Sequence, residues 1–324
     1  MVELRRNPGA RFAPSFSRGA FTLIELLVAM AVFSLIVIAM VGVVSQVGKL
    51  WQHGEGQNQR RANGRAMLQF IARELQAATL PVSAPSLVSA TTSSKANLQM
   101  VANLPANSDN STIIPSSVLN PHAIFWQAPI ARDGPAGDLP CIGYFLRWDT
   151  TTRPGVALGR LCRYYVKPSD AAYLIYTQQG GEPANWLSNI DTVAPGSDSG
   201  YRGWFADNVI AFWVRCLDGA GQPITQTASG QSLNGGYGFD SRQGYTDSAQ
   251  KVHKPNALPA AVEIALVTVD ASAALRIAAP INVQATDPAI FYEDIQTFMN
   301  ALPSSVKSGA QLYSTKVYLQ NSTP

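Results

Sequence analysis

The residue whose surroundings most need a chemical explanation is Glu25, which lies near the start of an apolar segment. From Leu26 to Val44, a run of 19 residues, only Ser34 and Gly42 interrupt the apolar side chains. That length is close to the ~20 residues that an α-helix needs to cross the core of a bilayer. A carboxylate inside such a helix costs about 2.5–3.5 kcal/mol at the centre and less near an end, and such residues usually have a function. Glu25 is therefore a candidate functional residue.

The charges that precede this segment predict its orientation. Four arginines and one glutamate give residues 1–20 a net charge of +3, which leaves 20 basic and 20 acidic side chains in the rest of the chain. By the positive-inside rule, the N-terminus is expected to be cytoplasmic and the remainder exported. The neutral body gives no support to a nucleic-acid surface. An ordinary cleaved signal peptide is the alternative, although its apolar region is usually only about 7–15 residues long.

The rest of the chain offers few residues at the spacing that catalysis or metal binding requires. The motifs G-x-S-x-G and H-E-x-x-H and a phosphate-binding glycine loop are absent from the sequence. Cysteines and histidines are scattered, without a C-x-x-C pair, so no zinc site is predicted. They are Cys141, Cys162 and Cys216, and His53, His122 and His253. We expect a protein that is not an enzyme and needs no cofactor.

Two side-chain questions stay open at this level. Cys141 and Cys162 lie on neighbouring strand-like runs and could form a disulfide in an exported domain, or they could be small buried thiols. The segment 234–250 is rich in Gly, Asp and Tyr and is expected to be an exposed loop. Asp240 and Asp247 within it are the best calcium ligands if the protein holds a metal, although their spacing is not that of an EF-hand.

The N-terminal segment resembles a known superfamily. The run "AFTLIELLVAMAVFSLIVIAMVGVV" is similar to the N-terminus of type IV pilins and of type II secretion pseudopilins. In that superfamily a dedicated prepilin peptidase removes a short basic leader that usually ends in Gly. The peptidase cuts before a Phe and methylates the new amine, and the fifth mature residue is Glu. A cut between Ala20 and Phe21 places Glu25 at that fifth position, whereas a cut after Gly19 would restore the glycine and place Glu25 sixth. We favour the cut at Ala20–Phe21.

The resemblance gives Glu25 a chemical role. Once the leader is removed, the Phe21 amine is a cation at the membrane edge, and Glu25 of a neighbouring subunit can pair with it in a filament. A buried pair of this kind specifies register, because an unpaired partner is heavily penalised in a low dielectric. Pairing of Glu25 with its own N-terminus is compatible with the same sequence. The implied partners are prepilin peptidase, other pilins, an inner-membrane assembly platform and membrane lipid, with no nucleic acid expected.

A single long helix is expected to begin in this segment. No proline occurs between Phe21 and Leu80, so about 60 residues can form one helix. Glycines in the polar stretch 53–65 predict a kinked or flexible middle. Further on, apolar residues recur at helical spacing and are expected to pack on a domain, with charged side chains on other faces. The apolar residues are Leu68, Ile71, Leu75 and Ala78, and the charged ones are Arg65, Arg73 and Glu74.

The remaining chain reads mainly as β-strands. Aromatic and β-branched runs predict strands, and Asp287 followed by Pro288 predicts the capped start of a short helix. The expected strands are 141–148, 161–166, 173–176, 209–217, 262–269 and 312–319. Five aromatic residues could line a partner surface, although strand aromatics are more often core. These are Trp186, Trp204, Trp213, Tyr201 and Tyr237.

The sequence therefore predicts an α+β fold, with a long N-terminal transmembrane helix packed on an antiparallel β-rich head. We assign residues 1–20 to the leader, 21–47 to the transmembrane helix, 48–80 to its amphipathic continuation and 81–324 to a periplasmic head. The order of these runs also resembles J-type minor pseudopilins and the Verrucomicrobial cassette protein C group. The size of the head favours a minor subunit. A tip adhesin or DNA-uptake subunit is the alternative, and an anchored enzyme is a third class that no motif supports.

Overall fold

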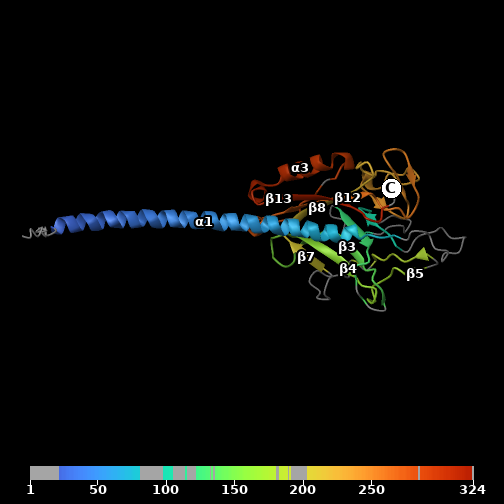
Figure 1. The fold of residues 1–324 in the computed structure, drawn as a ribbon, viewed down its shortest axis with the longest axis horizontal. Coiled ribbons are helices and arrows are strands. Elements are labelled where there is room, and N and C mark those ends of the chain that lie inside the picture. The colour runs from blue at the N-terminus through green and yellow to red at the C-terminus, as the bar shows by residue number, and fades with distance from the viewer. Residues whose placement is uncertain are drawn as a thin grey trace, which may run out of the picture. The chain divides into compact units, whose positions relative to one another are not determined.

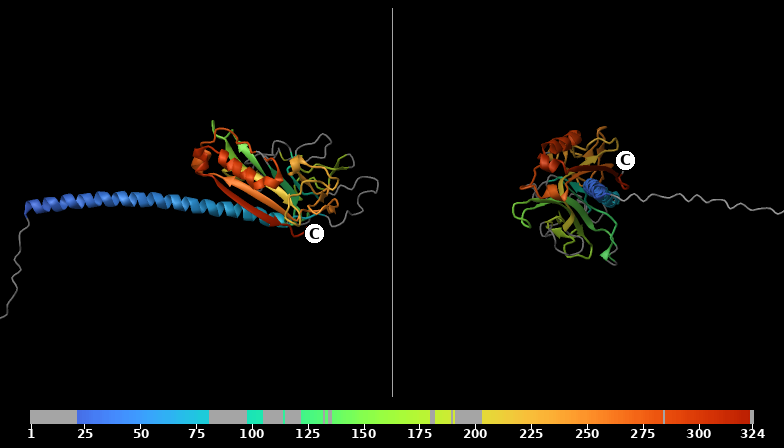
Figure 2. Two further views of the ribbon diagram at one scale, coloured as in Figure 1. Left: turned by 90° about the horizontal axis from the view of Figure 1, so that it is seen from above. Right: turned by 90° about the vertical axis from the view of Figure 1, so that its left-hand side faces the viewer.

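The structure is a computed structural model that describes most of the chain in two compact units, Met1–Gln59 and Arg60–Pro324. The described residues are 22–80, 98–104, 114, 122–131, 133, 136–179, 182–188, 190, 203–283 and 285–322, of which 42–61, 178–179 and 182–183 are described by their backbone alone. Figures 1 and 2 show the ribbon.

The N-terminal unit contains the first part of helix α1, which runs from Leu23 to Gln76. The helix continues through Gly54 and Gly56, and the kinked or flexible middle stays a prediction. Between Leu23 and Val41 it is long and apolar enough to span a membrane, with a mean hydropathy of 2.7 and none of that stretch buried. The apolar side chains have no protein surface to cover them among the described residues.

The last part of α1 belongs to the second unit, the head. Its predicted apolar stripe is buried, because Leu68, Ile71, Leu75 and Ala78 all lie in the main hydrophobic core. The helix ends at Gln76, before Pro81 could interrupt it. One expectation is wrong: Glu74 is not on an outer face but is almost fully buried beside the stripe.

The head contains a six-stranded antiparallel sheet with the strand order β7-β4-β3-β2-β1-β9. Its two long strands, β3 and β4, form the hairpin that the sequence predicts, although β4 begins three residues earlier than expected. Strands β2 and β7 were not predicted. The bounds are β1 Val101–Ala102, β2 Ala123–Gln127, β3 Cys141–Asp149, β4 Leu158–Val166, β7 Gly203–Asp207 and β9 Phe239–Asp240.

A second antiparallel sheet has the order β13-β12-β8. All three strands were predicted to within one residue at each end: β8 Val209–Leu217, β12 Ala261–Thr268 and β13 Gln311–Tyr318. The predicted strand at 173–176 is wrong, since that segment forms turns. Small elements complete the described head: β5 Gln178–Gln179, β6 Glu182–Pro183, β10 Tyr245–Thr246, β11 Val252–His253, α2 Ala271–Ala274 and α4 Ser304–Lys307.

Helix α3, Phe291–Ala301, covers the second sheet. As predicted, Asp287 caps the preceding turn, Pro288–Ile290: its carboxylate accepts a hydrogen bond from the Ala289 N–H at 2.8 Å. The buried face of α3 packs against the sheet through Phe298, whose ring meets Trp213 edge to face at 5.2 Å. The helix therefore closes one face of the sheet.

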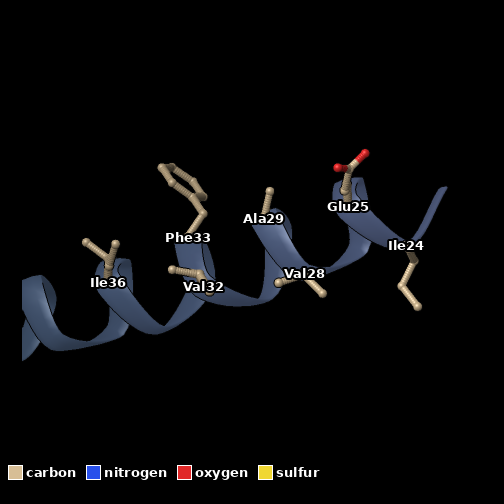
Figure 3. Close-up of a pocket in the computed structure, with 7 residues that line it drawn as sticks. All are labelled: Ile24, Glu25, Val28, Ala29, Val32, Phe33 and Ile36. Atoms are coloured by element: carbon tan, nitrogen blue, oxygen red, sulfur yellow. The ribbon is translucent and has the colours of Figure 1, made fainter. Parts of the chain in front are cut away.

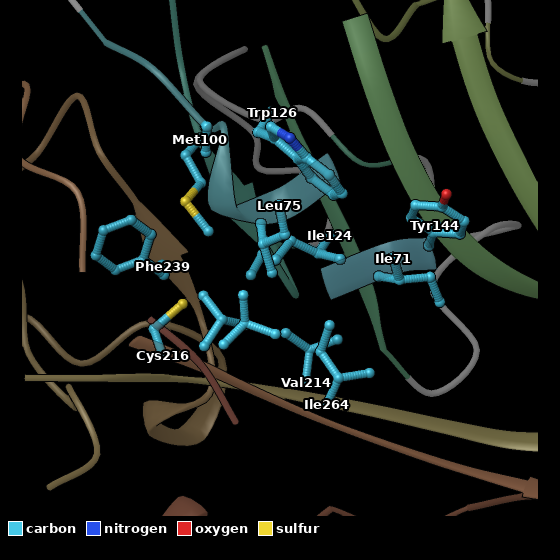
Figure 4. Close-up of a cluster of buried hydrophobic side chains, with 14 of the residues drawn as sticks. Ile71, Leu75, Met100, Ile124, Trp126, Tyr144, Val214, Cys216, Phe239 and Ile264 are labelled. Atoms are coloured by element: carbon cyan, nitrogen blue, oxygen red, sulfur yellow. The ribbon is translucent and has the colours of Figure 1, made fainter. Parts of the chain in front are cut away.

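The opposite face of this sheet meets the end of α1. Figure 4 shows Ile71 and Leu75 of the helix in the core, with Trp126 on one side and Val214 and Ile264 on the other. Residues of both sheets share this cluster with the helix, so the end of α1 is part of the main core of the head. This confirms the predicted α+β class.

The cysteines of the first sheet do not form a disulfide. Cys141 lies opposite Val166 and Cys162 lies opposite Phe145, four residues apart along the paired strands. Four residues span about 13 Å of strand, whereas disulfide-bonded Cα atoms lie within about 7 Å. All three cysteines are free and buried, so the reading of these residues as buried thiols is confirmed.

Candidate functional site: the N-terminal end of the apolar helix

Helix α1 begins with a reciprocal cap formed by two side chains. The Glu25 carboxylate accepts hydrogen bonds from the Thr22 N–H and from Thr22 Oγ1, both at 3.0 Å. In return, the Glu25 N–H donates to Thr22 Oγ1 at 3.3 Å. This T-x-x-E arrangement is a capping box, which satisfies orphan donors at a helix start. The cap explains why the helix begins here and holds the carboxylate at the helix end.

Both hydrogen bonds from Thr22 reach the same carboxylate oxygen, Oε2. No described residue donates to the other oxygen, Oε1. Sequence analysis assigned no role to Thr22, although the spacing T-x-x-E could have identified it as the cap. The carboxylate therefore retains the capacity to accept hydrogen bonds from a further donor.

The surroundings of Glu25 are apolar. Figure 3 shows Glu25, Ala29 and Phe33 projecting from the same side of the helix, as their four-residue spacing requires. Other residues around this face are aliphatic: Ile24, Val28, Val32 and Ile36. All of them are exposed. A surface of this kind can be covered by lipid or by another apolar helix, and both leave a carboxylate in need of a donor.

The proposed partner of Glu25 lies outside the described residues. Ala20 and Phe21, the predicted cleavage site and methylated residue, precede the first described residue, Thr22. The structure therefore brings Glu25 together with Thr22 and leaves the cleavage site and the amine as predictions.

The two calcium candidates lie in different hydrogen-bonded turns. Asp240 is buried, and its carboxylate accepts from Gln99 Nε2 at 2.8 Å and from the Arg242 N–H at 2.9 Å. Asp247 accepts from the Lys251 N–H at 2.8 Å and lies 3.0 Å from His253 Nε2. The hydrogen bond from His253 lowers the pKa of Asp247. Both carboxylates thus accept hydrogen bonds from protein donors and do not point into an empty site for a metal ion.

In the part of the chain that the structure describes, no three His, Cys, Asp or Glu side chains are grouped so that they could hold a metal ion. The segment around the two aspartates is also less exposed than expected, because Tyr237, Phe239 and Tyr245 are buried. It contributes strands β9 and β10 to the head, so the expectation of a wholly exposed loop is wrong.

Most of the aromatic residues considered for a partner surface belong to the core. Trp186, Trp213 and Tyr237 are buried. Trp204 is 39% exposed, and the guanidinium of Arg160 lies over its ring. Tyr201 is outside the described residues. These side chains do not form a shared surface in the described head.

One polar cluster was missed by sequence analysis. The buried carboxylate of Glu74 forms an ion pair with Arg163 of β4 and accepts a hydrogen bond from Tyr144 Oη of β3 at 2.5 Å. Burial, followed by the negative charge of Glu74, raises the pKa of Tyr144 above its ordinary value, so the hydroxyl stays protonated and donates. The three-residue spacing from Ile71 could have placed Glu74 beside the apolar stripe.

Comparison with known proteins identifies the N-terminal segment. Residues 16–41 match the family model of the prokaryotic N-terminal methylation motif. Neither a curated protein nor a solved structure matches the chain. The matched residues include Phe21 and Glu25, so the chain carries the N-terminal motif of type IV pilin-like proteins. The finer resemblance to J-type pseudopilins and to the cassette group stays a prediction.

Proposed function

We propose that this chain is a pilin-like subunit, matured by prepilin peptidase between Ala20 and Phe21 and assembled into a filament through its N-terminal helix. The observation that carries the proposal is Glu25, which lies exposed on an apolar helix within the matched methylation motif. Cleavage before Phe21 makes Glu25 the fifth residue of the mature chain. The new amine then lies about one helical turn from the carboxylate in sequence.

The chemistry of assembly follows from this spacing. The methylated Phe21 amine is a cation, and Glu25 Oε1 accepts no hydrogen bond from a described residue. When a neighbouring subunit covers the apolar face, the amine of one chain pairs with Glu25 of the next and sets the axial register between them. Misregistered subunits would leave both charges unpaired in a low dielectric. The apolar stripe supplies contact area, and the ion pair selects one alignment.

We also propose where the protein lies in the cell and to which kind of filament it belongs. We propose that the N-terminus lies in the cytoplasm, the helix in the inner membrane and the head in the periplasm, and the arginines of the leader support this orientation. We propose that the chain is a minor subunit of a type IV pilus or of a type II secretion pseudopilus. Its large head would obstruct the lateral packing of neighbouring subunits along a filament. Proteins with this motif are structural subunits, and we propose the same for this chain, without catalytic activity.

Substitution of Glu25 tests the proposal. Glu25→Ala is expected to leave leader cleavage largely intact while abolishing incorporation into filaments, measured by the fraction of chains in sheared filaments. Ser34→Ala is the matched control, since the Ser34 hydroxyl donates within its own helix to the Met30 carbonyl at 2.8 Å. The control is expected to assemble like wild type. If Glu25→Ala chains are recovered in filaments as efficiently as wild type, the assembly role of Glu25 is wrong.

A further inference from the structure

Strand β13 lies at one edge of the three-stranded sheet in the head. It pairs with β12 along its whole length, from Gln311 opposite Thr268 to Tyr318 opposite Ala261. It has eight residues, more than the roughly 5–6 of a typical strand, and none of them is proline or glycine. Natural proteins usually keep an edge strand short, bulged or interrupted by proline, which prevents its pairing with other chains. None of these three devices is present in β13.

Alternate residues of β13 direct their backbone N–H and C=O groups away from β12. The Leu319 N–H donates to the Ala260 carbonyl at 3.1 Å, on the side of β12. The next N–H, of Gln320, donates in another direction, to the Gln76 carbonyl of α1. Since the direction alternates along an antiparallel strand, the outward-facing residues of β13 are Leu312, Ser314, Lys316 and Tyr318. In the described head, no hydrogen bond reaches the backbone groups of these residues.

The side chains of the outward-facing residues are accessible as well. Tyr318 is 68% exposed and Leu312 is 38% exposed, near the two ends of the strand. Ser314 and Lys316 between them are also exposed. The end of α1 packs on one face of this sheet and α3 packs on the other, and neither helix buries these four residues. A strand added at this edge would therefore meet both backbone groups without partners and accessible side chains.

Lys316 determines which kind of strand can be added. It is the single charged residue of β13, and its neighbour across the sheet is Glu263. The Glu263 carboxylate is occupied by an ion pair with Arg215 and by a hydrogen bond from Tyr292. Lys316 itself forms no ion pair with a described residue. A carboxylate opposite Lys316 on an added strand would stabilise the pairing, and a second cation there would oppose it.

We propose that the edge of β13 binds an extended, acidic segment of another protein, which joins the three-stranded sheet as a fourth strand. The backbone of this segment pairs with the outward-facing groups of β13, and its carboxylate lies opposite Lys316. Its apolar side chains contact Tyr318 and Leu312. A second copy of β13 does not fit, because the strand offers a lysine and no carboxylate. Binding at this edge does not require the assembly of filaments through Glu25.

Peptide binding to the full chain in detergent tests the role of the charge. The probes are two end-capped, fluorescently labelled peptides, TTVETVT and TTVKTVT, which differ in the charge of the central residue. We expect the acidic peptide to bind the wild-type chain about fivefold more tightly than the basic one, measured by fluorescence anisotropy. Lys316→Glu is expected to reverse this order. Lys254→Glu is the matched control, since Lys254 is exposed and lies outside β13, and it should keep the wild-type order.

Backbone pairing is tested separately. Ser314→Pro removes an outward-facing N–H and leaves the pairing with β12 in place, so it is expected to weaken binding of the acidic peptide at least about tenfold while the melting temperature stays near that of the wild type. On the wild-type chain, the acidic peptide with alternate backbone amides methylated should lose binding to the same extent. Hydrogen exchange of residues 311–318, followed by mass spectrometry, should slow when the unmethylated acidic peptide is added.

The acidic-strand site is refuted if the two peptides bind the wild-type chain equally, or if neither binds at about 1 mM. It is also refuted if Lys316→Glu keeps the wild-type order, or if the methylated peptide binds as tightly as the unmethylated one. A monomer–dimer equilibrium of the chain alone, measured by analytical ultracentrifugation and lost in Ser314→Pro, would identify a second copy as the occupant and contradict the acidic partner. None of these results bears on whether Glu25 is needed for incorporation into filaments.

Discussion

Helix α1 carries two glutamates in apolar surroundings, and the two differ in where their partners are. Glu74 has its cation and its hydroxyl donor inside the head, from β3 and β4. Glu25 lies on an exposed apolar face, where Thr22 of its own helix is its described partner. A carboxylate in such surroundings needs a donor in either case. Glu74 is therefore paired within one chain, whereas we propose that Glu25 is paired between chains.

The largest expected difference between the two glutamates is in the stability of the head. Glu74→Ala removes the carboxylate that pairs with the buried Arg163 and is expected to lower the free energy of unfolding by about 3–5 kcal/mol. Glu25→Ala is expected to change it by less than about 0.5 kcal/mol, because Glu25 belongs to the N-terminal unit and not to the head. Urea unfolding of the detergent-solubilised chain, followed by tryptophan fluorescence, measures both. If both variants lose the same free energy of unfolding, Glu74 and Glu25 do not differ in their contribution to the stability of the head.

A second prediction concerns His122, a buried histidine of the head. His122 Nδ1 lies 2.9 Å from the Val214 carbonyl oxygen and 3.2 Å from the Val214 nitrogen, and burial lowers the pKa of His122 to about 4. An unfolded chain has a histidine pKa of about 6.5, so the unfolded state binds the proton first. The stability of the head is therefore complete above about pH 6.5 and falls by about 3 kcal/mol as the pH approaches 4.

The measurement is the free energy of unfolding between pH 7 and pH 4. The variant His122→Gln is expected to lose most of this pH dependence, whatever its stability at pH 7. A wild-type head whose stability is flat across this range would contradict the neutral, buried state of His122.

The smallest expected effect concerns the thiols. Burial raises the pKa of Cys162 to about 12, with similar upward shifts for Cys141 and Cys216, so the folded head should react slowly with thiol reagents. We expect three reactive thiols per chain after unfolding, and no change in melting temperature on adding a reductant. Recovery of one thiol from protein that was never reduced would show a disulfide and contradict the three free thiols.

Most of the architecture was predictable because it follows from local patterns. Long strands such as β8 and β12 have aromatic and β-branched residues bounded by turns, and the predicted bounds agree with the structure to within one residue. Strand β2 was missed because it is only five residues long, too short to show a clear period. The turns at 173–176 show the opposite error, since aromatic content alone does not make a strand.

The polar contacts were harder to predict, for a physical reason. A charged residue is usually exposed, and this expectation placed Glu74 on an outer face although its spacing from Ile71 puts it beside the buried stripe. Its partner Arg163 lies 89 residues away in the sequence, and no local pattern connects them. Glu25 was predictable because the segment around it is apolar on every side. The Thr22 cap could have been predicted from the spacing T-x-x-E.

The central claim is that the chain is matured to expose an amine four residues before Glu25. Mass spectrometry of the N-terminus of the protein purified from its native membrane tests this most directly. The account predicts a mature chain that begins with N-methylated Phe21. An intact Met1, or an N-terminus at Gln46 left by an ordinary signal peptidase, would contradict it.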